Sequence, residues 1–405
     1  MLTAICLLLG GCASDATSAT TVMTTTATTV STTTTSAPLV PVERRAVWVS
    51  LFELNEGLSA CQTEEEAKRW LDMMMDTAVA SKMNTVFFHV RANSDAYYGS
   101  TLFPPAKAAD ALLKKGFDPL TYAVEAAHKR GIELHAWINP YRIGKNEPNI
   151  VDGVATMKDD AGRYYYVPTA ASAQRLILDG VREVLARYDV DGIQYDDYFY
   201  PENFLDETTV YPFEKDDYAA HKADGGVLSV ADWRRAAVDS LIAATHTLTK
   251  AAGVVFGISP SMNAEKTYTT MYADSKKWLA ESGYVDYICP QLYVGFDNEK
   301  TSFTDSVDMW ADYPRDPSVS LYAGLALYKI GLKDDTWAGV GRTEWLTHTD
   351  VMKRSVEYAR EKGLDGLCFY SFSFLTPATC KTADFTKNND KTVAEQEVQN
   401  LLTVL

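Results

Sequence analysis

The chain has 405 residues, of which 46% are hydrophobic and 23% are charged, values that allow one large globular domain or two ordinary ones. The formal net charge of -16 argues against nucleic acid, whose phosphates require Lys and Arg, and against charge-driven docking on anionic lipid. The acidic balance suits a neutral substrate or an extracytoplasmic enzyme.

The N-terminus resembles a bacterial lipoprotein signal. Residues 1–11 read MLTAICLLLGG, an apolar run too short to span a bilayer, and Cys12 follows. We expect cleavage before Cys12 and lipidation of this cysteine, although no Lys or Arg precedes the apolar run. A plain secretory signal or a buried helix is the alternative. Lipidation would give an extracytoplasmic protein anchored to the cell membrane by lipid alone.

The segment that follows the signal, residues 12–42, is dominated by Thr, Ser and Ala, with TTVMTTTATTVSTTTTS at its centre. Such a composition cannot bury a core and predicts a disordered stalk. Residues 43–405 are then expected to form one folded domain.

From Arg44 onward, β-branched and aromatic runs alternate with amphipathic, helix-like stretches. The predicted strands are 45–52, 85–92, 133–140, 192–199, 254–261, 287–294, 320–328 and 366–374. Eight strands, each followed by a helix, predict a (β/α)₈ barrel of the TIM type with long βα loops. A doubly wound sheet is the alternative, but the first strand is not followed by the Gly-rich phosphate loop typical of that fold.

Four cysteines lie in the predicted domain. Cys289 and Cys368 fall in strand-like runs, whereas Cys61 and Cys380 fall in predicted loops. No CxxC or Cys/His spacing suits zinc. We expect mostly free thiols, and the spacing leaves a Cys61–Cys380 disulfide open.

Side chains alternate along a strand, so in a barrel one parity faces the helices and the other faces the interior and the mouth. In five predicted strands, the residue near the end of the strand that has the inward-facing parity is polar. These residues are Arg91, Asn139, Asp196, Ser259 and Gln291. Aromatic residues join the same predicted rim: Trp137, Tyr198, Tyr200 and Tyr293. Aromatic surface beside polar side chains suits a carbohydrate, which has apolar ring faces and hydroxyl edges.

The stretch DGIQYDDYFYP, residues 191–201, contains two adjacent aspartates. The same parity rule points Asp196 into the mouth and Asp197 toward the opposite face, where it would serve as a supporting residue. Glycoside hydrolysis needs two carboxyl groups. The candidates for the second lie just after strand ends: Glu53, Asp95, Asp297 and Asp197.

Other chemistries find less support. The histidines lack the His-x-His spacing of barrel metallohydrolases, and His89 and His135 are interpreted as core residues. No GxSxG elbow or P-loop occurs. Acidic loop residues could hold calcium, although such residues are more often solvated, and a metal site using both Asp196 and Asp197 is a weaker hypothesis. We therefore expect no cofactor and no protein-bound metal.

Several segments together resemble the glycosyl-hydrolase-like 10 family of bacterial lipoproteins. They include RAVWVSLFE, VFFHVRANSDAYYGS, GIELHAWINPYR, RYDVDGIQYDDYFYP and VDYICPQLYVGF, and the similarity runs in order from about residue 44 to 375. The resemblance implies a glycosidase-like barrel on the cell envelope that acts on cell-wall glycan such as peptidoglycan. It places functional polar residues at Arg91, Asn139, Arg142, Asp196, Asp197 and Gln291.

The sequence therefore predicts a monomeric, lipid-anchored glycoside hydrolase with a carbohydrate polymer as substrate. Asp196 would be the principal catalytic carboxylate and Asp197 would tune it or supply the second carboxyl. A non-catalytic glycan-binding barrel is the alternative.

Overall fold

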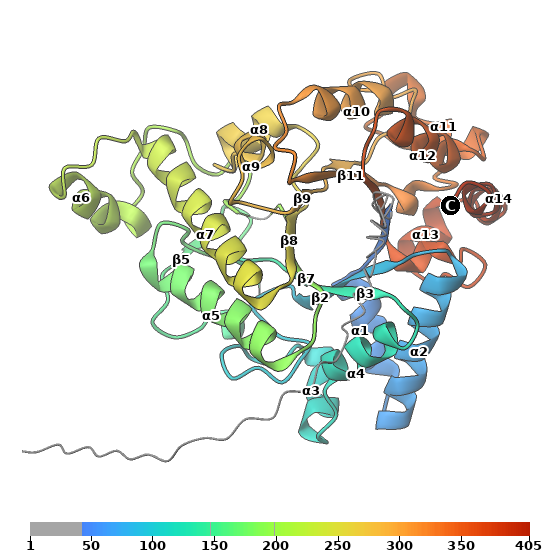
Figure 1. Ribbon diagram of the computed structural model, residues 1–405, viewed down its shortest axis with the longest axis horizontal. Helices are drawn as coiled ribbons and strands as arrows, with labels where there is room; N and C mark the ends of the chain where they lie inside the picture. Colours follow the sequence, from blue (N-terminus) through green and yellow to red (C-terminus); the bar gives the residue numbers. More distant parts are fainter. Residues whose placement is uncertain (1–42, 146, 198) are drawn as a thin grey trace, which may run out of the picture. The chain divides into compact units, whose positions relative to one another are not determined.

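Eight parallel strands close into a barrel, and helices surround them (Figure 1). The computed structural model describes residues 43–145, 147–197 and 199–405. The predicted signal, Cys12 and the Thr-rich segment lie outside these residues. The barrel strands are β1 (Arg44–Val49), β2 (Thr85–Arg91), β3 (Glu133–Ile138), β7 (Gly192–Tyr195), β8 (Val255–Ile258), β9 (Tyr287–Ile288) with β10 (Gln291–Leu292), β11 (Ser320–Leu325) and β12 (Gly366–Tyr370).

The sixth barrel strand is divided into β9 and β10. Pro290 stands between the two parts, and proline has no N–H to donate to a ladder. Both parts pair with β11, while β9 also pairs with β8. The pairing of β12 with both β11 and β1 completes the circle. The predicted (β/α)₈ fold is thus confirmed.

The predicted helical stretches form the outer layer, with additional short helices. The helices are α1 (Leu51–Ala60), α2 (Glu64–Ala80), α3 (Lys107–Lys114), α4 (Pro119–His128), α5 (Ala171–Arg187), α6 (Lys215–Ala223), α7 (Val230–Ala252), α8 (Ala264–Thr270), α9 (Ser275–Ala280), α10 (Phe303–Asp312), α11 (Glu344–Thr347), α12 (Val351–Glu361), α13 (Ala383–Asn388) and α14 (Lys391–Leu402). Among the described residues, no helix is long and apolar enough to cross a membrane.

The strands end earlier than their apolar runs suggest. β1 stops at Val49 because Ser50 caps α1: its side chain accepts an N–H from the first turn, and the carboxylate of Glu53 accepts the N–H of Ser50. The sequence SLFE carries this capping signature. β7 likewise ends at Tyr195. The residues beyond these ends form the rim of the barrel.

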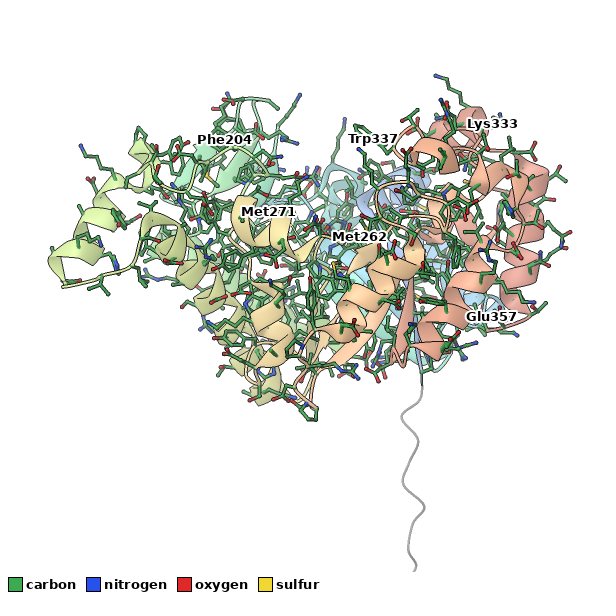
Figure 2. The ribbon with its side chains drawn as sticks, turned by 90° about the horizontal axis from the view of Figure 1, so that it is seen from above. Phe204, Met262, Met271, Lys333, Trp337 and Glu357 are labelled. Carbon is green, nitrogen blue, oxygen red and sulfur yellow. The ribbon has the colours of Figure 1, made fainter. Side chains whose placement is uncertain are left out.

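The long βα loops contain structure of their own. The segment after β3 folds into a small antiparallel sheet of β4 (Arg142–Gly144), β6 (Tyr164–Tyr166) and β5 (Thr156–Lys158). The segment after β7 includes α6. In Figure 2, Phe204 and Trp337 lie along the same edge of the domain, each on a segment that follows a barrel strand.

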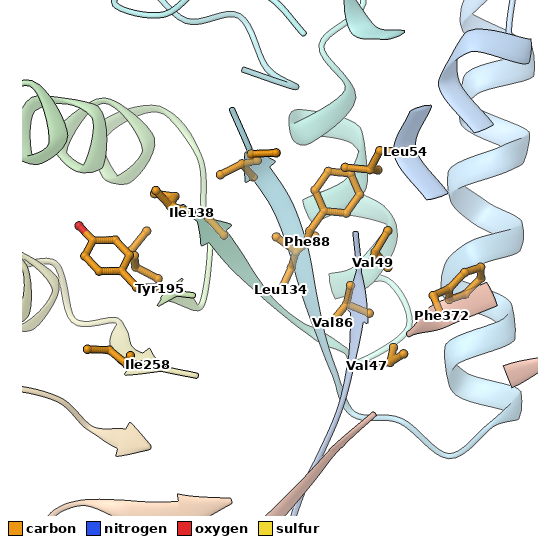
Figure 3. Packing of buried hydrophobic residues seen from close by; sticks show 14 of the residues in the cluster. Val47, Val49, Leu54, Val86, Phe88, Leu134, Ile138, Tyr195, Ile258 and Phe372 are labelled. Carbon is orange, nitrogen blue, oxygen red and sulfur yellow. The ribbon is translucent and has the colours of Figure 1, made fainter. Parts of the chain in front are cut away.

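The hydrophobic core has two parts. Apolar side chains such as Val47, Phe88 and Leu134 fill the layer between the barrel and the helices (Figure 3). A second cluster lies inside the barrel and includes Trp48, Phe87, Trp137, Tyr287 and Tyr322. This division follows the alternation of side chains along each strand.

The four described cysteines are free thiols. Cys289 and Cys368 are buried, whereas Cys61 and Cys380 are partly exposed. The bridge that the sequence left open between Cys61 and Cys380 is therefore not formed in this structure.

Candidate active site

A pocket of about 260 Å³ opens at the carboxyl ends of the barrel strands. Its lining combines aromatic, polar and charged side chains: Trp48, Leu51, Phe52, His89, Trp137, Asn139, Arg142, Asp196, Asp197, Ser259, Gln291, Tyr293 and Tyr370. Barrel enzymes place their active sites at this face. Seven of the sequence-predicted site residues besides Asp196 line it, namely Trp137, Asn139, Arg142, Asp197, Ser259, Gln291 and Tyr293.

Asp196 and Asp197 both line the pocket, and here the sequence interpretation was wrong about Asp197. We expected adjacent residues to point apart, but that alternation holds only within a strand, and β7 ends at Tyr195. The backbone N–H of Asp197 donates to Oδ1 of Asp196 at 2.8 Å. The turn therefore leaves both side chains in the lining of one pocket, with the Asp196 carboxylate bonded to the backbone of Asp197.

The environment of the pair favours a retained proton. Asp196 is 8% exposed and Asp197 is half-buried. Burial raises the pKa of Asp196 above its usual value. Burial, and then the negative charge of Asp196, raise the pKa of Asp197 well above its usual range. Two close carboxyl groups rarely ionise together, so the pair holds one proton into a higher pH range than an isolated aspartate would.

Gln291 holds the pair in place. Its Nε2 donates to Oδ1 of Asp196 at 3.2 Å and to the carbonyl of Ser259 at 3.0 Å. The hydroxyl of Ser259 donates to the carbonyl of Cys289 at 3.1 Å. These bonds connect the residues just after β7 and β8 to the start of β10, so the carboxylate is oriented by three strands.

His89, Trp137 and Asn139 form the opposite part of the pocket. The His89 and Trp137 rings are stacked, with centroids 3.6 Å apart. Nδ1 of His89 accepts the N–H of Leu51 at 3.3 Å, which leaves the proton on Nε2. Burial, followed by the charge of Arg142, holds the pKa of His89 well below its usual range. His89 is therefore a neutral donor in the site, a role that sequence reasoning missed.

Several polar atoms in this region have no protein partner. They are Nε2 of His89, Nε1 of Trp137 and Oδ1 of Asn139, all buried. Asn139 uses its Nδ2 to donate to the carbonyl of Ala92 at 3.1 Å. Buried polar groups without partners are costly in a protein interior. Hydroxyl and amide groups of a bound ligand would satisfy these three atoms.

Tyr293, Tyr370 and Trp48 form an aromatic wall. The rings of Tyr293 and Tyr370 are stacked with centroids 5.9 Å apart, and Tyr370 meets Trp48 edge to face at 6.2 Å. Parity in the first and eighth strands groups Trp48 with Ala46 and Tyr370 with Cys368 on the inner face, so the sequence carries a signal for this wall.

Arg91 does not reach the pocket, contrary to the prediction. β2 and β3 pair in step as far as His89 and Trp137, but the next pair is Arg91 with Ile138, so Val90 forms a bulge. One extra residue moves the following side chain to the other face. Arg91 is buried in the helix layer, with its guanidinium 4.3 Å from the Phe103 ring centroid.

The other candidates for a second carboxylate lie outside the pocket lining. Glu53 caps α1 and accepts the N–H of Ser373 at 3.2 Å. Asp95 is buried and accepts the N–H of Asn93, and burial raises the pKa of its carboxyl. Asp297 lies beyond β10, where its N–H donates to Glu344 at 3.0 Å. Asp196 and Asp197 are the carboxylates of the pocket among the described residues.

Two predicted rim tyrosines have other outcomes. Tyr200 is 1% exposed and packs edge to face on Tyr272 with centroids 5.1 Å apart, outside the pocket. It leaves the rim because the chain turns into the helix layer after β7. Tyr198 lies outside the described residues.

No group of three or more His, Cys, Asp or Glu side chains within residues 43–145, 147–197 and 199–405 could hold a metal ion. The chemistry that this part of the chain offers is that of the paired carboxyls and their hydrogen-bonding neighbours.

Comparison with known proteins places the chain among glycosyl hydrolase-like proteins. Glycosyl hydrolase YngK of Bacillus subtilis is 31% identical over 335 residues, which cover 73% of this chain and 63% of that protein. Glycosyl hydrolase DigH of Escherichia coli K12 is 32% identical over 287 residues, which cover 62% of this chain and 63% of that protein. The matched region thus spans less than two thirds of the length of these curated relatives.

Solved structures agree on the fold. The glycoside hydrolase domain of PgaB (BpsB) from Bordetella bronchiseptica superposes with a TM-score of 0.54 at 13% identity, covering 89% of this chain and 99% of that chain. The alpha-L-fucosidase isoenzyme 2 of Paenibacillus thiaminolyticus gives a TM-score of 0.52 at 14% identity, covering 89% of this chain and 49% of that chain.

The glycosyl hydrolase-like 10 family model matches residues 43–339, which include β1 through β11 and every barrel residue of the pocket except Tyr370. The chain therefore belongs to the glycosyl hydrolase-like 10 family.

Proposed function

We propose that the protein is a glycoside hydrolase that cleaves O-glycosidic bonds in the glycan strands of peptidoglycan. The observation that carries this proposal is the adjacent Asp196–Asp197 pair in an aromatic-lined pocket at the carboxyl ends of the strands. Family membership supports it.

The two carboxyl groups can take different roles in acid catalysis. Asp197 has the more strongly raised pKa, so it is the group that keeps the proton and can donate it to the leaving glycosidic oxygen. Asp196 receives the N–H of Asp197 and the amide of Gln291, and these bonds favour its ionised form. An ionised Asp196 would stabilise positive charge that develops in the sugar.

The described pocket lining offers no carboxyl beyond the adjacent pair, which favours a nucleophile supplied by the substrate. Retaining glycosidases that use two carboxyls hold them about 5–5.5 Å apart and inverting ones about 6.5–9.5 Å apart. Here the pocket's carboxyls belong to adjacent residues, and Asp196 accepts the backbone N–H of Asp197 at 2.8 Å. In substrate-assisted hydrolysis the acetamido oxygen of an N-acetylated sugar attacks C1, the C1–O bond breaks, and the acid protonates the departing oxygen. Water then opens the cyclic intermediate and returns a proton to the acid.

The remaining pocket residues would bind and orient the sugar. Asn139 and His89 offer unpartnered polar atoms, and Arg142 supplies a positive charge near Asp196. Tyr293 and Trp137 present aromatic faces on which a sugar ring can stack.

Digestion of purified peptidoglycan, with and without its stem peptides, followed by mass analysis of the products, tests the proposal. The wild-type protein should release shorter glycan fragments, and Asp196→Asn and Asp197→Asn should each reduce the rate by about 10²-fold or more. A chelator should leave the rate unchanged. Full activity in a normally folded Asp196→Asn variant would rule out the assignment.

A non-catalytic glycan-binding protein is the second candidate. It is favoured by one observation, which is that the described pocket contains no carboxyl group apart from the adjacent pair. Binding of peptide-free glycan without any product, and with equal affinity in Asp197→Asn, would support this alternative.

We also propose that a lipid on Cys12 anchors the protein to the outer face of the cell membrane. The motif LLLGGC at residues 7–12 supports this location. Replacement of Cys12 by Ser should move the expressed protein from the membrane fraction to the soluble fraction. Membrane retention of the Ser variant would contradict lipid anchoring.

A further inference from the structure

A second cavity adjoins the pocket. It has a volume of about 700 Å³ and shares two side chains with the pocket, Phe52 and Tyr370. Its far wall is formed by α13 and by the short 3₁₀ helices η3 (Leu327–Lys329) and η5 (Phe372–Leu375). We call this cavity the α13 groove.

Aromatic side chains continue from the pocket into the α13 groove. Phe52 is 66% exposed, an unusual state for a large apolar side chain, and it lies in the first turn of α1. Tyr370 stacks on Tyr293 on the pocket side and meets Tyr328 edge to face, with centroids 5.9 Å apart, on the groove side. Phe374 lines the groove further along.

The junction between pocket and groove is fixed by a buried carboxylate. Glu53 is 7% exposed and accepts the N–H of Ser50 at 3.0 Å, the N–H of Ser373 at 3.2 Å and the hydroxyl of Ser371. These bonds tie the start of α1 to the segment after β12. Phe52 and Tyr370, which border both cavities, are thus held on elements that are bonded to each other.

We infer that the α13 groove binds the sugar units that adjoin the one held in the pocket, so that the protein recognises a strand rather than a single sugar. This inference rests on the proposed function. At about 260 Å³ the pocket lies below the range of about 300–1,000 Å³ usual for small-ligand sites, whereas the groove offers about 700 Å³ on the other side of the shared residues Phe52 and Tyr370.

The polar lining of the groove indicates which part of a glycan it takes. Glu56, Asp384 and Asn388 line it, so it offers carboxylates and an amide beside the aromatic rings. Carboxylates and amides form hydrogen bonds with hydroxyl and acetamido groups. The groove therefore suits hydroxyl-rich, N-acetylated sugars.

Part of the groove wall lies beyond the residues that the family model matches. The matched region ends at residue 339, while η5 and α13 lie beyond it. If this wall gives the protein a preference for longer strands, residues of the C-terminal segment would be responsible for that preference.

Filling the groove tests the inference. Ala383 is exposed and lines the groove at the start of α13, so Ala383→Trp should obstruct it without disturbing the core. Lys387→Trp is the matched control, since Lys387 is exposed on the same helix but does not line the groove. Asn388→Trp places the same obstruction at the other end of the groove lining. An effect shared by both variants therefore does not come from a local folding defect at residue 383.

The readout is kcat/KM for reducing-end-labelled, peptide-free glycan strands of increasing length, from a disaccharide upward. In the wild type and in Lys387→Trp, kcat/KM should rise by about tenfold or more with length. Ala383→Trp and Asn388→Trp should lose this rise and match the wild type on the shortest cleaved strand. Equal length dependence in all four proteins would overturn the inference.

Two further outcomes separate the inference from the proposed function. If the wild type neither binds nor cleaves any strand, the proposed function fails, and the inference fails with it. If the wild type cleaves strands but the Trp variants lose activity only on strands that carry stem peptides, the groove binds peptide, and the inference alone is overturned.

Discussion

At the scale of single residues, the end of β7 determines where the side chains of Asp196 and Asp197 lie. Asp196 still donates its backbone N–H to the carbonyl of Ile138, but Asp197 lies in the turn beyond the ladder. Each carboxyl group therefore influences the pKa of the other. An isolated aspartate ionises below neutral pH, whereas this pair retains a proton because burial and mutual repulsion disfavour a double charge.

The first prediction concerns the pKa of Asp197. Asp196→Asn removes the negative charge that helps to raise it, so the pKa of Asp197 should fall while remaining above the usual value because burial persists. Carboxyl ¹³C NMR of Asp-labelled protein measures this change directly. An unchanged titration of Asp197 would show that the two groups are not coupled.

The protonation states of Asp196 and Asp197 should set the pH dependence of wild-type activity. The proposed acid must be protonated and its partner ionised, so activity should decline as pH rises through the raised pKa of Asp197, and decline again at low pH when Asp196 takes a proton. A pH profile of kcat/KM tests this bell shape. A profile that stays flat into the alkaline range would argue against Asp197 as the acid.

At the scale of elements, the bulge in β2 decides which side chains reach the site. His89, just before the bulge, still faces the pocket, whereas Arg91, just after it, is turned into the helix layer. Arg91 fits there because α5 presents Gly180: a Cβ at this position would lie 2.4 Å from Nη1 of Arg91 and 2.8 Å from the Phe103 ring. A glycine inside a helix is otherwise unfavourable, so its place is explained by this close approach.

Gly180→Ala should therefore destabilise the protein even though alanine is the better helix former. The added methyl group should cost about 1–3 kcal/mol through the clash, which outweighs the gain of about 1 kcal/mol in helix propensity. Urea unfolding measures the difference. Combining Gly180→Ala with Arg91→Ala should relieve part of the clash, so purely additive effects in the double variant would contradict this account.

A buried ion pair anchors the long segment after β7. Arg234 of α7 and Glu214 are both fully buried, and Nη1 of Arg234 also donates to the carbonyl of Asp206 at 2.7 Å. Glu214→Leu should leave an unpaired buried charge and cost about 3–5 kcal/mol. Limited proteolysis within residues 201–229, compared with wild type, should show faster cleavage. Equal cleavage and equal thermal stability would mean that the pair does not hold this segment.

At the scale of the whole molecule, α14 closes the domain through a buried carboxyl. Glu397 is 0% exposed and accepts the N–H groups of Val351 at 2.8 Å and Met352 at 3.3 Å at the start of α12. Burial raises the pKa of Glu397 from 4.5 to about 7. The folded state thus binds a proton more tightly than the unfolded state, so this group's contribution to stability is full below about pH 4.5 and is lost as pH rises to about 7.

Glu397→Gln should remove this part of the pH dependence. The lost contribution is on the order of 3 kcal/mol between these two pH values. Gln can accept only one of the two N–H groups, so the variant should also be less stable than wild type at acidic pH. Urea unfolding across the pH range provides the test. Parallel wild-type and variant curves would show that Glu397 does not titrate in this range.

The sequence by itself determined the barrel, the order of its strands and much of the pocket lining, including Asp196, Asn139, Ser259 and Gln291. The alternation of side chains is a local property, so it can be predicted from the sequence wherever a strand is regular. The tertiary structure decided the place of Arg91 and the partnership of Asp197 with Asp196, because a bulge and a strand end arise from pairing with neighbouring strands. It also decided that Phe52 and Tyr370 meet beside α13, since residues so distant in sequence are brought together only by closure of the barrel.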